Sequence, residues 1–157
     1  MCECDLIDVQ AFVQFNVNFK YLLTVINVFS KYFHIVPLKS KSGTAVTSAF
    51  KSILEIPKYS KRIQTQPIWF RTDKGKEFLN RQFQDMLISK GIQFQVFEIL
   101  DLKFSIDERA QRNIRYKLYK YITYSNSNRY IDVLQKFVDA YKRYCSLCYW
   151  HGAIKSY

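Results

Sequence analysis

Three apolar segments separated by short polar stretches occupy the first 38 residues, and this pattern restricts the fold more than any other feature of the chain. Residues 5–15, 21–29 and 32–38 are rich in β-branched and aromatic side chains, which favour β-strands. The segment from Asn16 to Asn18 is typical of a turn. Short connections between consecutive strands predict an antiparallel meander at the start of the domain.

The rest of the chain alternates between helical and strand-like patterns. Apolar residues recur at helical spacing between Gly43 and Pro57, and a short strand is expected over 67–70. The helix between the meander and this strand allows the strand to lie parallel in the same sheet. The elements that follow are a helix over 80–90, a strand over 92–97, a helix over 105–124 and a helix from 131 onward. For 157 residues this order predicts one domain of the α/β class, with a five-stranded mixed sheet flanked by helices.

The charge of the chain is strongly positive. It carries 24 Lys and Arg against 13 Asp and Glu, and residues 37–157 hold most of the excess. Such an excess favours a polyanionic partner, because Lys and Arg release counterions from phosphate groups when they bind nucleic acid. A basic surface that serves only solubility is the alternative.

The cysteines and the hydropathy bear on the cellular compartment. Cys2, Cys4, Cys145 and Cys148 stand near the two ends of the sequence, and the N-terminus lacks the basic region and apolar core of a secretory signal. The apolar stretch 21–29 is too short to span a bilayer. We therefore expect free thiols, a reducing compartment and no membrane partner. A zinc site built from the Cys-x-Cys and Cys-x-x-Cys pairs is the alternative.

Three acidic residues stand on three separate predicted elements. Asp5 begins the first strand, Asp73 follows the fourth, and Glu108 lies in the first turn of a helix. If the first and fourth strands are neighbours, Asp5 and Asp73 converge at one edge of the sheet. Clustered carboxylates raise one another's pKa unless cations neutralise them, and their hard oxygen ligands suit Mg²⁺ or Mn²⁺. The acids therefore predict a site for two divalent ions that acts on phosphodiesters.

Each acid also has a purely structural explanation. Ser105 precedes Glu108 by three residues, which is the spacing of a helix capping box. Asp73 before Lys-Gly is an ordinary turn former, and Asp5 can be a solvated residue at a strand end. Asp8 is a rival for the role of Asp5.

The helix that bears Glu108 is basic. Arg112 and Arg115 lie four and seven residues after the acid and share its side of the helix, while Arg109 flanks it. A catalytic acid on a basic stripe suits the positioning of a phosphate backbone. A solvated surface with ion pairs within the helix is the alternative.

The order and the sequences of these motifs resemble those of the catalytic core of retroviral-type integrases, and especially those of the integrases of Maverick/Polinton DNA transposons. The resemblance covers almost the whole chain, and 34 residues separate Asp73 from Glu108, in keeping with that family. The stretches that carry it include Asp5-Leu-Ile-Asp-Val-Gln10, Tyr21 to Tyr32, Val36 to Gly43, Arg71-Thr-Asp-Lys-Gly-Lys-Glu-Phe78, Asp101-Leu-Lys103 and Ser105-Ile-Asp-Glu-Arg109.

The resemblance implies a ribonuclease H-like fold and an integrase that joins DNA 3′ ends to target DNA. Asp5 and Asp73 would then hold one Mg²⁺ or Mn²⁺ ion, and Asp5 and Glu108 a second. It further implies DNA ends and a target duplex as partners, a homo-oligomer, and a nuclear location because of the DNA substrate. The residues expected to contact DNA are Lys74, Lys76, Lys103, Arg109, Arg112 and Arg115.

The sequence also departs from the family pattern. Cys2 stands where a Trp is usual, Asn27 where an Asp is usual, and Ala110-Gln111-Arg112 in place of Phe-Asn-Arg. We expect 1–157 to be an integrase core without the family's N-terminal zinc-binding and C-terminal DNA-binding domains. These departures leave a decayed, nucleic-acid-binding remnant of a transposon integrase as an alternative to an active integrase. A nuclease of the ribonuclease H type is a third possibility, because it shares the fold and the acids.

Overall fold

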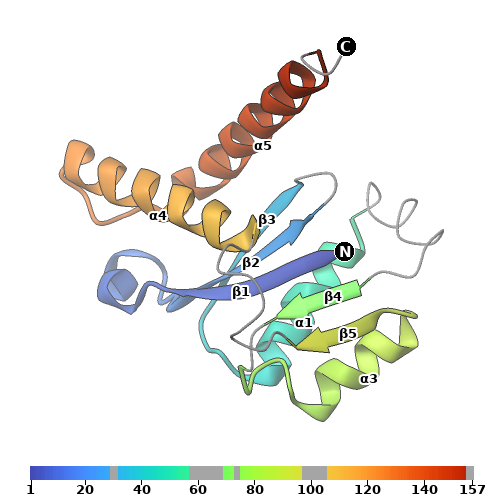
Figure 1. Ribbon diagram of the computed structural model, residues 1–157. Helices are drawn as coiled ribbons and strands as arrows, with labels where there is room; N and C mark the ends of the chain where they lie inside the picture. Colours follow the sequence, from blue (N-terminus) through green and yellow to red (C-terminus); the bar gives the residue numbers. More distant parts are fainter. Residues whose placement is uncertain (29–31, 57–68, 73–74, 97–105, 155–157) are drawn as a thin grey trace.

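A five-stranded mixed sheet forms the centre of the protein, as the sequence predicts (Figure 1). The computed structural model describes residues 1–28, 32–56, 69–72, 75–96 and 106–154, without the side chains of 106–108 and 144–154. The strand order across the sheet is β3-β2-β1-β4-β5, in which β1, β2 and β3 are antiparallel and β4 and β5 run parallel to β1. The strands are β1 (Cys2–Asp8), β2 (Tyr21–Asn27), β3 (Phe33–Leu38), β4 (Trp69–Thr72) and β5 (Gln93–Val96).

The helices cover the two faces of the sheet and enclose two apolar clusters (Figure 1). On one face, α1 (Gly43–Leu54) and α3 (Arg81–Ser89) bury a cluster rich in phenylalanine. On the other face, α4 (Ile106–Ser125) packs on β1 and β2, and α5 (Ile131–Ile154) packs on β3. The apolar residues that recur at helical spacing are the ones buried in these helices, such as Val46 and Phe50 in α1. Ser42 and Asn80 cap the N-termini of α1 and α3, because their side-chain oxygens accept from backbone N–H groups in the first turn of each helix.

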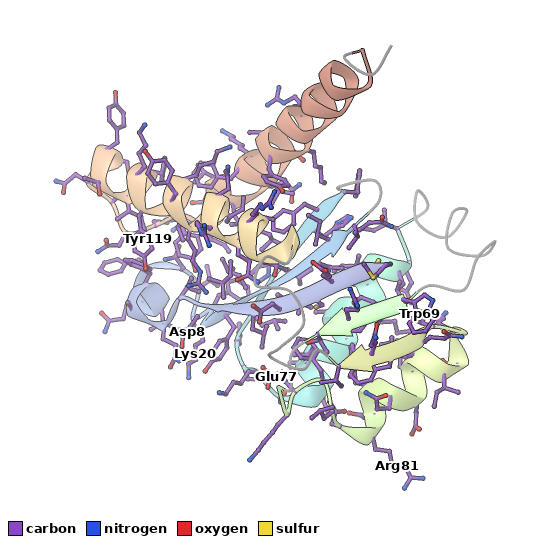
Figure 2. The ribbon with its side chains drawn as sticks, in the orientation of Figure 1. Asp8, Lys20, Trp69, Glu77, Arg81 and Tyr119 are labelled. Carbon is purple, nitrogen blue, oxygen red and sulfur yellow. The ribbon has the colours of Figure 1, made fainter. Side chains whose placement is uncertain are left out.

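The first strand is shorter than predicted. β1 ends at Asp8, and residues 10–15 form a 3₁₀ helix, η1 (Gln10–Phe15). The strand also begins at Cys2, before the predicted start, so Asp5 lies in its middle rather than at its beginning. The apolar composition of this segment serves packing against helices instead of sheet pairing. Phe12 of η1 meets the rings of Tyr119 in α4 and Tyr130 before α5 edge-on, with centroids 5.9 and 6.3 Å away. Figure 2 shows Tyr119 on α4. Tertiary contacts have overridden the strand propensity of these residues.

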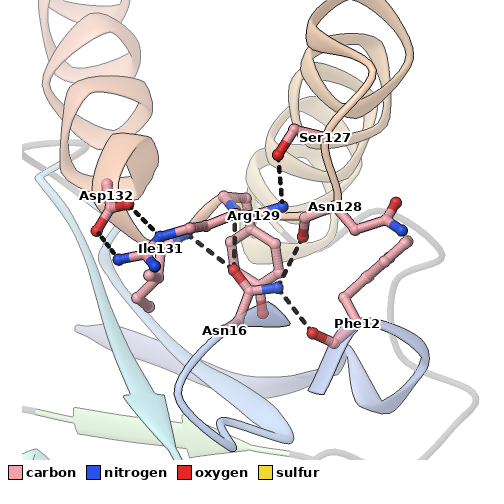
Figure 3. Close-up of polar contacts among 8 residues, drawn as sticks. Phe12, Asn16, Ser127, Asn128, Arg129, Ile131 and Asp132 are labelled. Atoms are coloured by element: carbon pink, nitrogen blue, oxygen red, sulfur yellow. Dashed lines mark hydrogen bonds and ion pairs between the residues drawn. The ribbon is translucent and has the colours of Figure 1, made fainter. Parts of the chain in front are cut away.

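Asn16, directly after η1, holds the start of α5 in place (Figure 3). Its side chain is fully buried and makes four hydrogen bonds. The amide Nδ2 donates to the carbonyl oxygens of Phe12 and Asn128, both at 2.8 Å. The Oδ1 atom accepts from the backbone N–H groups of Tyr130 and Ile131 at 2.8 and 3.1 Å. Asn16 thus caps the N-terminus of a helix more than a hundred residues away in the sequence.

Replacing Asn16 by Ala should lower the free energy of unfolding by about 2–4 kcal/mol, because it leaves buried donors and acceptors without partners. Urea unfolding followed by circular dichroism measures this. Asn128→Ala is the matched control, since only the backbone carbonyl of Asn128 joins the network and its side chain is exposed. Equal destabilisation by the two variants would contradict the capping role of Asn16.

Candidate active site

Asp5 is held between β1 and α4 by a small polar network. Its Oδ1 atom accepts from the backbone N–H of Leu6 at 2.7 Å, and its Oδ2 atom accepts from Nε2 of Gln111 at 2.8 Å. The same Gln111 nitrogen donates to the hydroxyl of Thr24 at 3.2 Å. That hydroxyl in turn donates to the carbonyl oxygen of Asp5 at 3.0 Å. The network fixes the orientation of a half-buried carboxylate.

The network follows from how α4 packs on the sheet. Ala110, Ile114 and Leu118 are buried against β1 and β2, so α4 presents this side to the sheet. Gln111 lies on the same side of the helix, and only 6 % of it is exposed. Because Thr24 is directly opposite Asp5 in the antiparallel pair, one amide can reach both residues. A buried polar group needs such partners, since leaving it unpaired costs about 1–3 kcal/mol.

The other two predicted acids fall partly or wholly outside the described residues. Asp73 follows the last residue of β4 in the sequence but lies outside the described part of the chain. Position 108 is in the first turn of α4, one turn before Gln111, and its side chain is likewise not described. The condition set for the convergence of Asp5 and Asp73 is met, because β1 and β4 are neighbours and pair in parallel. The meeting of the three carboxylates stays a prediction. Among the described residues, no three His, Cys, Asp or Glu side chains are grouped as a metal site would require.

Asp8, the rival of Asp5, lies elsewhere. Its carboxylate is exposed and accepts from the backbone N–H and the side-chain amide of Gln10 at 2.9 and 2.8 Å. Side chains alternate along a strand, so Asp8 is on the opposite face of the sheet from Asp5 and α4. Its bonding is that of a residue that ends a strand and starts a turn.

The outward face of α4 carries basic side chains together with the exposed tyrosines Tyr116, Tyr119 and Tyr124. From Arg109 to Ser125 the helix carries five bases and no acid, which excludes ion pairs within this segment. Arg109, Arg112 and Arg115 are exposed, and their contact with a phosphate backbone stays a prediction. Lys76 is also exposed, in the turn that follows β4, whereas Lys74 and Lys103 lie outside the described residues.

The cysteines do not favour the zinc alternative. Cys2 and Cys4 are buried in the cluster between the sheet and α1 and α3, and burial raises the pKa of Cys2 to about 11. The helix that contains Cys145 and Cys148 packs on the other face of the sheet. The side chains of Cys145 and Cys148 themselves lie outside the described part of the chain. In the described part of the chain, no helix is both long and apolar enough to cross a bilayer.

Two residues of the site were not predicted as such from the sequence. Thr24 is a polar residue inside a buried strand, and Gln111 is a polar residue within an otherwise apolar side of a helix. A polar side chain in either position must find a buried partner, which is the signal that could have identified them. That they meet each other and Asp5 depends on strand register and helix packing, which the sequence alone did not give.

Comparisons with known proteins identify the family. Residues 1–98 match the family model described as an integrase core domain. An uncharacterised transposon-derived protein of Caenorhabditis elegans is 32% identical over 119 residues, covering 76% of this chain and 39% of that protein. The chain belongs to the integrase core domain family, of the retroviral type. It spans well under half of the length of this relative.

Solved structures of integrases share the fold. A chain of the simian T-cell lymphotropic virus intasome, in complex with the PP2A regulatory subunit B56 gamma, superposes with a TM-score of 0.68 at 16% identity. The match covers 87% of this chain and 46% of that one. The HTLV-2 integrase catalytic core, a dimer in complex with magnesium, gives a TM-score of 0.64 at 19% identity, covering 87% and 81% of the two chains. The fold is therefore the ribonuclease H-like fold of integrase catalytic cores, as predicted.

Gln111→Leu should lower the free energy of unfolding by about 1–2 kcal/mol, because it keeps the volume of the side chain but removes the amide that bonds Asp5 and Thr24. Urea unfolding at neutral pH measures the change. Gln135→Leu is the matched control, because Gln135 likewise donates to an aspartate. Its partner is Asp139, at 3.0 Å and one turn further along the exposed face of α5. A loss no larger than that of the control would show that the buried network contributes nothing to stability.

Proposed function

We propose that this protein is a metal-dependent polynucleotidyl transferase that joins transposon DNA 3′ ends to target DNA, with Asp5, Asp73 and Glu108 as its catalytic acids. The observation that carries the proposal is the hydrogen bond between Asp5 and Gln111. It ties the strand of the first acid to the helix of the third, one turn from position 108. Membership of the integrase core family supports the same assignment.

Strand register supports a common position for the first two acids. In the parallel pair, Glu3 is opposite Arg71. Asp5 lies two residues after Glu3, and Asp73 lies two residues after Arg71. Parallel strands advance together at about 3.3 Å per residue, and this equal spacing supports our proposal that Asp5 and Asp73 act on the same ion.

The environment of Asp5 suits a divalent ion. The Leu6 N–H and the Gln111 amide are neutral donors, and they orient the carboxylate without cancelling its charge. In our proposal Asp5 and Asp73 hold one Mg²⁺ or Mn²⁺ ion, and Asp5 and Glu108 hold a second. When bound, such ions stabilise charge on the attacking and leaving oxygens of a phosphodiester. The magnesium in the HTLV-2 core, a protein of the same fold, is consistent with this choice.

The protein's own contribution is to position the DNA. Arg109, Arg112 and Arg115 project from the helix that carries Glu108, so a phosphate backbone held by these residues passes the acids. Lys74, Lys76 and Lys103 extend the same basic surface in our proposal. No acid between Arg109 and Ser125 offsets this charge.

The more specific features are also proposals. The motifs shared with Maverick/Polinton integrases suggest a source in that kind of transposon, and a DNA substrate suggests a nuclear location. Transposon ends and a target duplex would be the DNA partners. The HTLV-2 core was solved as a dimer, which supports a homo-oligomer here.

A strand-transfer assay with Mn²⁺ tests the catalytic acids. Asp5→Asn, Asp73→Asn and Glu108→Gln should each reduce the product more than about 100-fold, since each removes a charged metal ligand. Asp8→Asn is the matched control and should keep its activity, because Asp8 lies on the other face of the sheet. Activity that survives all three changes would refute the proposal. Calorimetry should also show two ions binding to the unaltered protein and fewer to Asp5→Asn.

The basic face of α4 gives a separate prediction. Removing Arg109 and Arg115 together by Ala substitution should reduce the slope of log binding constant against log salt concentration by about 1.8, at about 0.9 per lost phosphate contact on duplex DNA. The control pair, Arg81→Ala with Lys90→Ala, removes the same charge from the two ends of α3, at its first residue and its C-cap, on the opposite face of the sheet. If both pairs change the slope equally, the binding reflects net charge alone and not a track along α4.

A catalytically decayed, nucleic-acid-binding remnant is the second candidate. The basic residues of α4 from Arg109 onward favour it equally, because binding to a phosphate backbone needs no acids. The calorimetric titration separates the two: an active integrase core binds divalent ions through Asp5, and a remnant does not.

A further inference from the structure

β4 and β5 expose a row of side chains on the α4 side of the sheet. Phe70 and Phe94 point toward the cluster under α1 and α3, so Trp69, Arg71 and their neighbours on β5 point the other way. Trp69 is 45% exposed, and Figure 2 shows it at the beginning of β4, away from α4 and α5. The two helices on this side pack on β1, β2 and β3 instead. The residues of this row are Trp69, Arg71, Gln93 and Gln95, of which Arg71 is half-buried and the others are exposed.

Strand register connects this row to the candidate active site. Arg71 is opposite Glu3 on β1 and opposite Gln95 on β5. Its Nε atom donates to Oε1 of Gln95 at 2.9 Å, which orients the guanidinium group. Glu3 precedes Asp5 by two residues and lies on the same face. The level of Trp69 is therefore roughly 13 Å along the strands from that of Asp5, at about 3.3 Å per residue.

The exposed tryptophan is the unusual member of the row. Tryptophan is highly buried on average, because its large ring gains much from leaving water. Nearly half of the surface of Trp69 nevertheless stays in contact with solvent. The indole offers a face on which a base can stack. The oriented guanidinium beside it can donate hydrogen bonds to a phosphate, and the two amides can hydrogen-bond to a base.

We propose that Trp69 and Arg71 form a subsite for one unpaired nucleotide of the nucleic-acid strand that passes Asp5. The base stacks on the Trp69 indole, and Arg71 contacts the adjoining phosphate. A base inside a duplex is already stacked on both sides, so only an unpaired base gains from this surface. The inference rests on the proposed function, because it takes nucleic acid as the substrate of this site.

Binding of a short single-stranded DNA oligonucleotide without divalent metal tests the subsite. Trp69→Ala should weaken this binding by about 5- to 100-fold, the range that one lost stacking contact produces. Trp69→Phe should restore part of the affinity, because it keeps a ring. Phe15→Ala is the matched control, since Phe15 is an aromatic residue that is 49% exposed and lies on η1, outside the sheet that contains β4. A blunt duplex of the same length should bind the unaltered protein and Trp69→Ala within about twofold of each other.

Fluorescence gives an independent readout. The chain has two tryptophans, so a Trp150→Phe background leaves Trp69 as the reporter, and stacking should quench it on addition of single strands but not of duplex. Unchanged single-strand affinity in Trp69→Ala would overturn the subsite while leaving the proposed function intact. Failure of the unaltered protein to bind either form of DNA would instead overturn both. Equal weakening for single strands and duplex would also overturn it, because that result indicates a general contact rather than stacking of an unpaired base.

Discussion

The hydrogen bond from Gln111 to Asp5 is the contact on which the geometry of the site depends. Apolar packing through Ala110, Ile114 and Leu118 fastens α4 to the sheet, but such contacts are non-directional and tolerate small rotations of a helix. A buried amide that must reach both a carboxylate and the Thr24 hydroxyl is directional. It therefore sets the rotation of α4 about its axis. That rotation decides where position 108, one turn earlier, stands relative to β1.

The same rotation directs the opposite face of α4 into solvent. Five bases without an intervening acid repel one another along the helix, so propensity and ion pairing within the segment do not account for its stability. The buried face and the connection to α5 supply it. Asn16 fixes that connection, because it bonds the backbone at both Asn128 and Ile131. A turn near the N-terminus thus supports the helix that presents the basic surface.

The periodic parts of the fold were predictable from the sequence, and the contacts between them were not. β-Branched and aromatic composition indicated the strands and helical spacing the helices, and the helix before β4 allowed the parallel pair that β4 forms with β1. The extension of the first strand beyond Asp8 was wrong, because Phe12 and its neighbours pack against Tyr119 and Tyr130 rather than pair in the sheet. The basic face of α4 needed only the helical period. The roles of Thr24 and Gln111 needed the register of β1 on β2 and the rotation of α4, which are tertiary facts.

The departures from the family pattern fall in different places, and this changes what they imply. Cys2 is buried on the side of the sheet away from Asp5, in a cluster whose rings of Phe50, Phe70 and Phe83 pack at centroid distances of 4.8–5.7 Å. A smaller residue at position 2 therefore bears on core packing and not on the chemistry of the site. Gln111 is the departure that does lie in the site, and it keeps an amide in contact with the first acid. The Gln111 amide orients the Asp5 carboxylate as a neutral donor, so this departure leaves the charge of the carboxylate available to a cation.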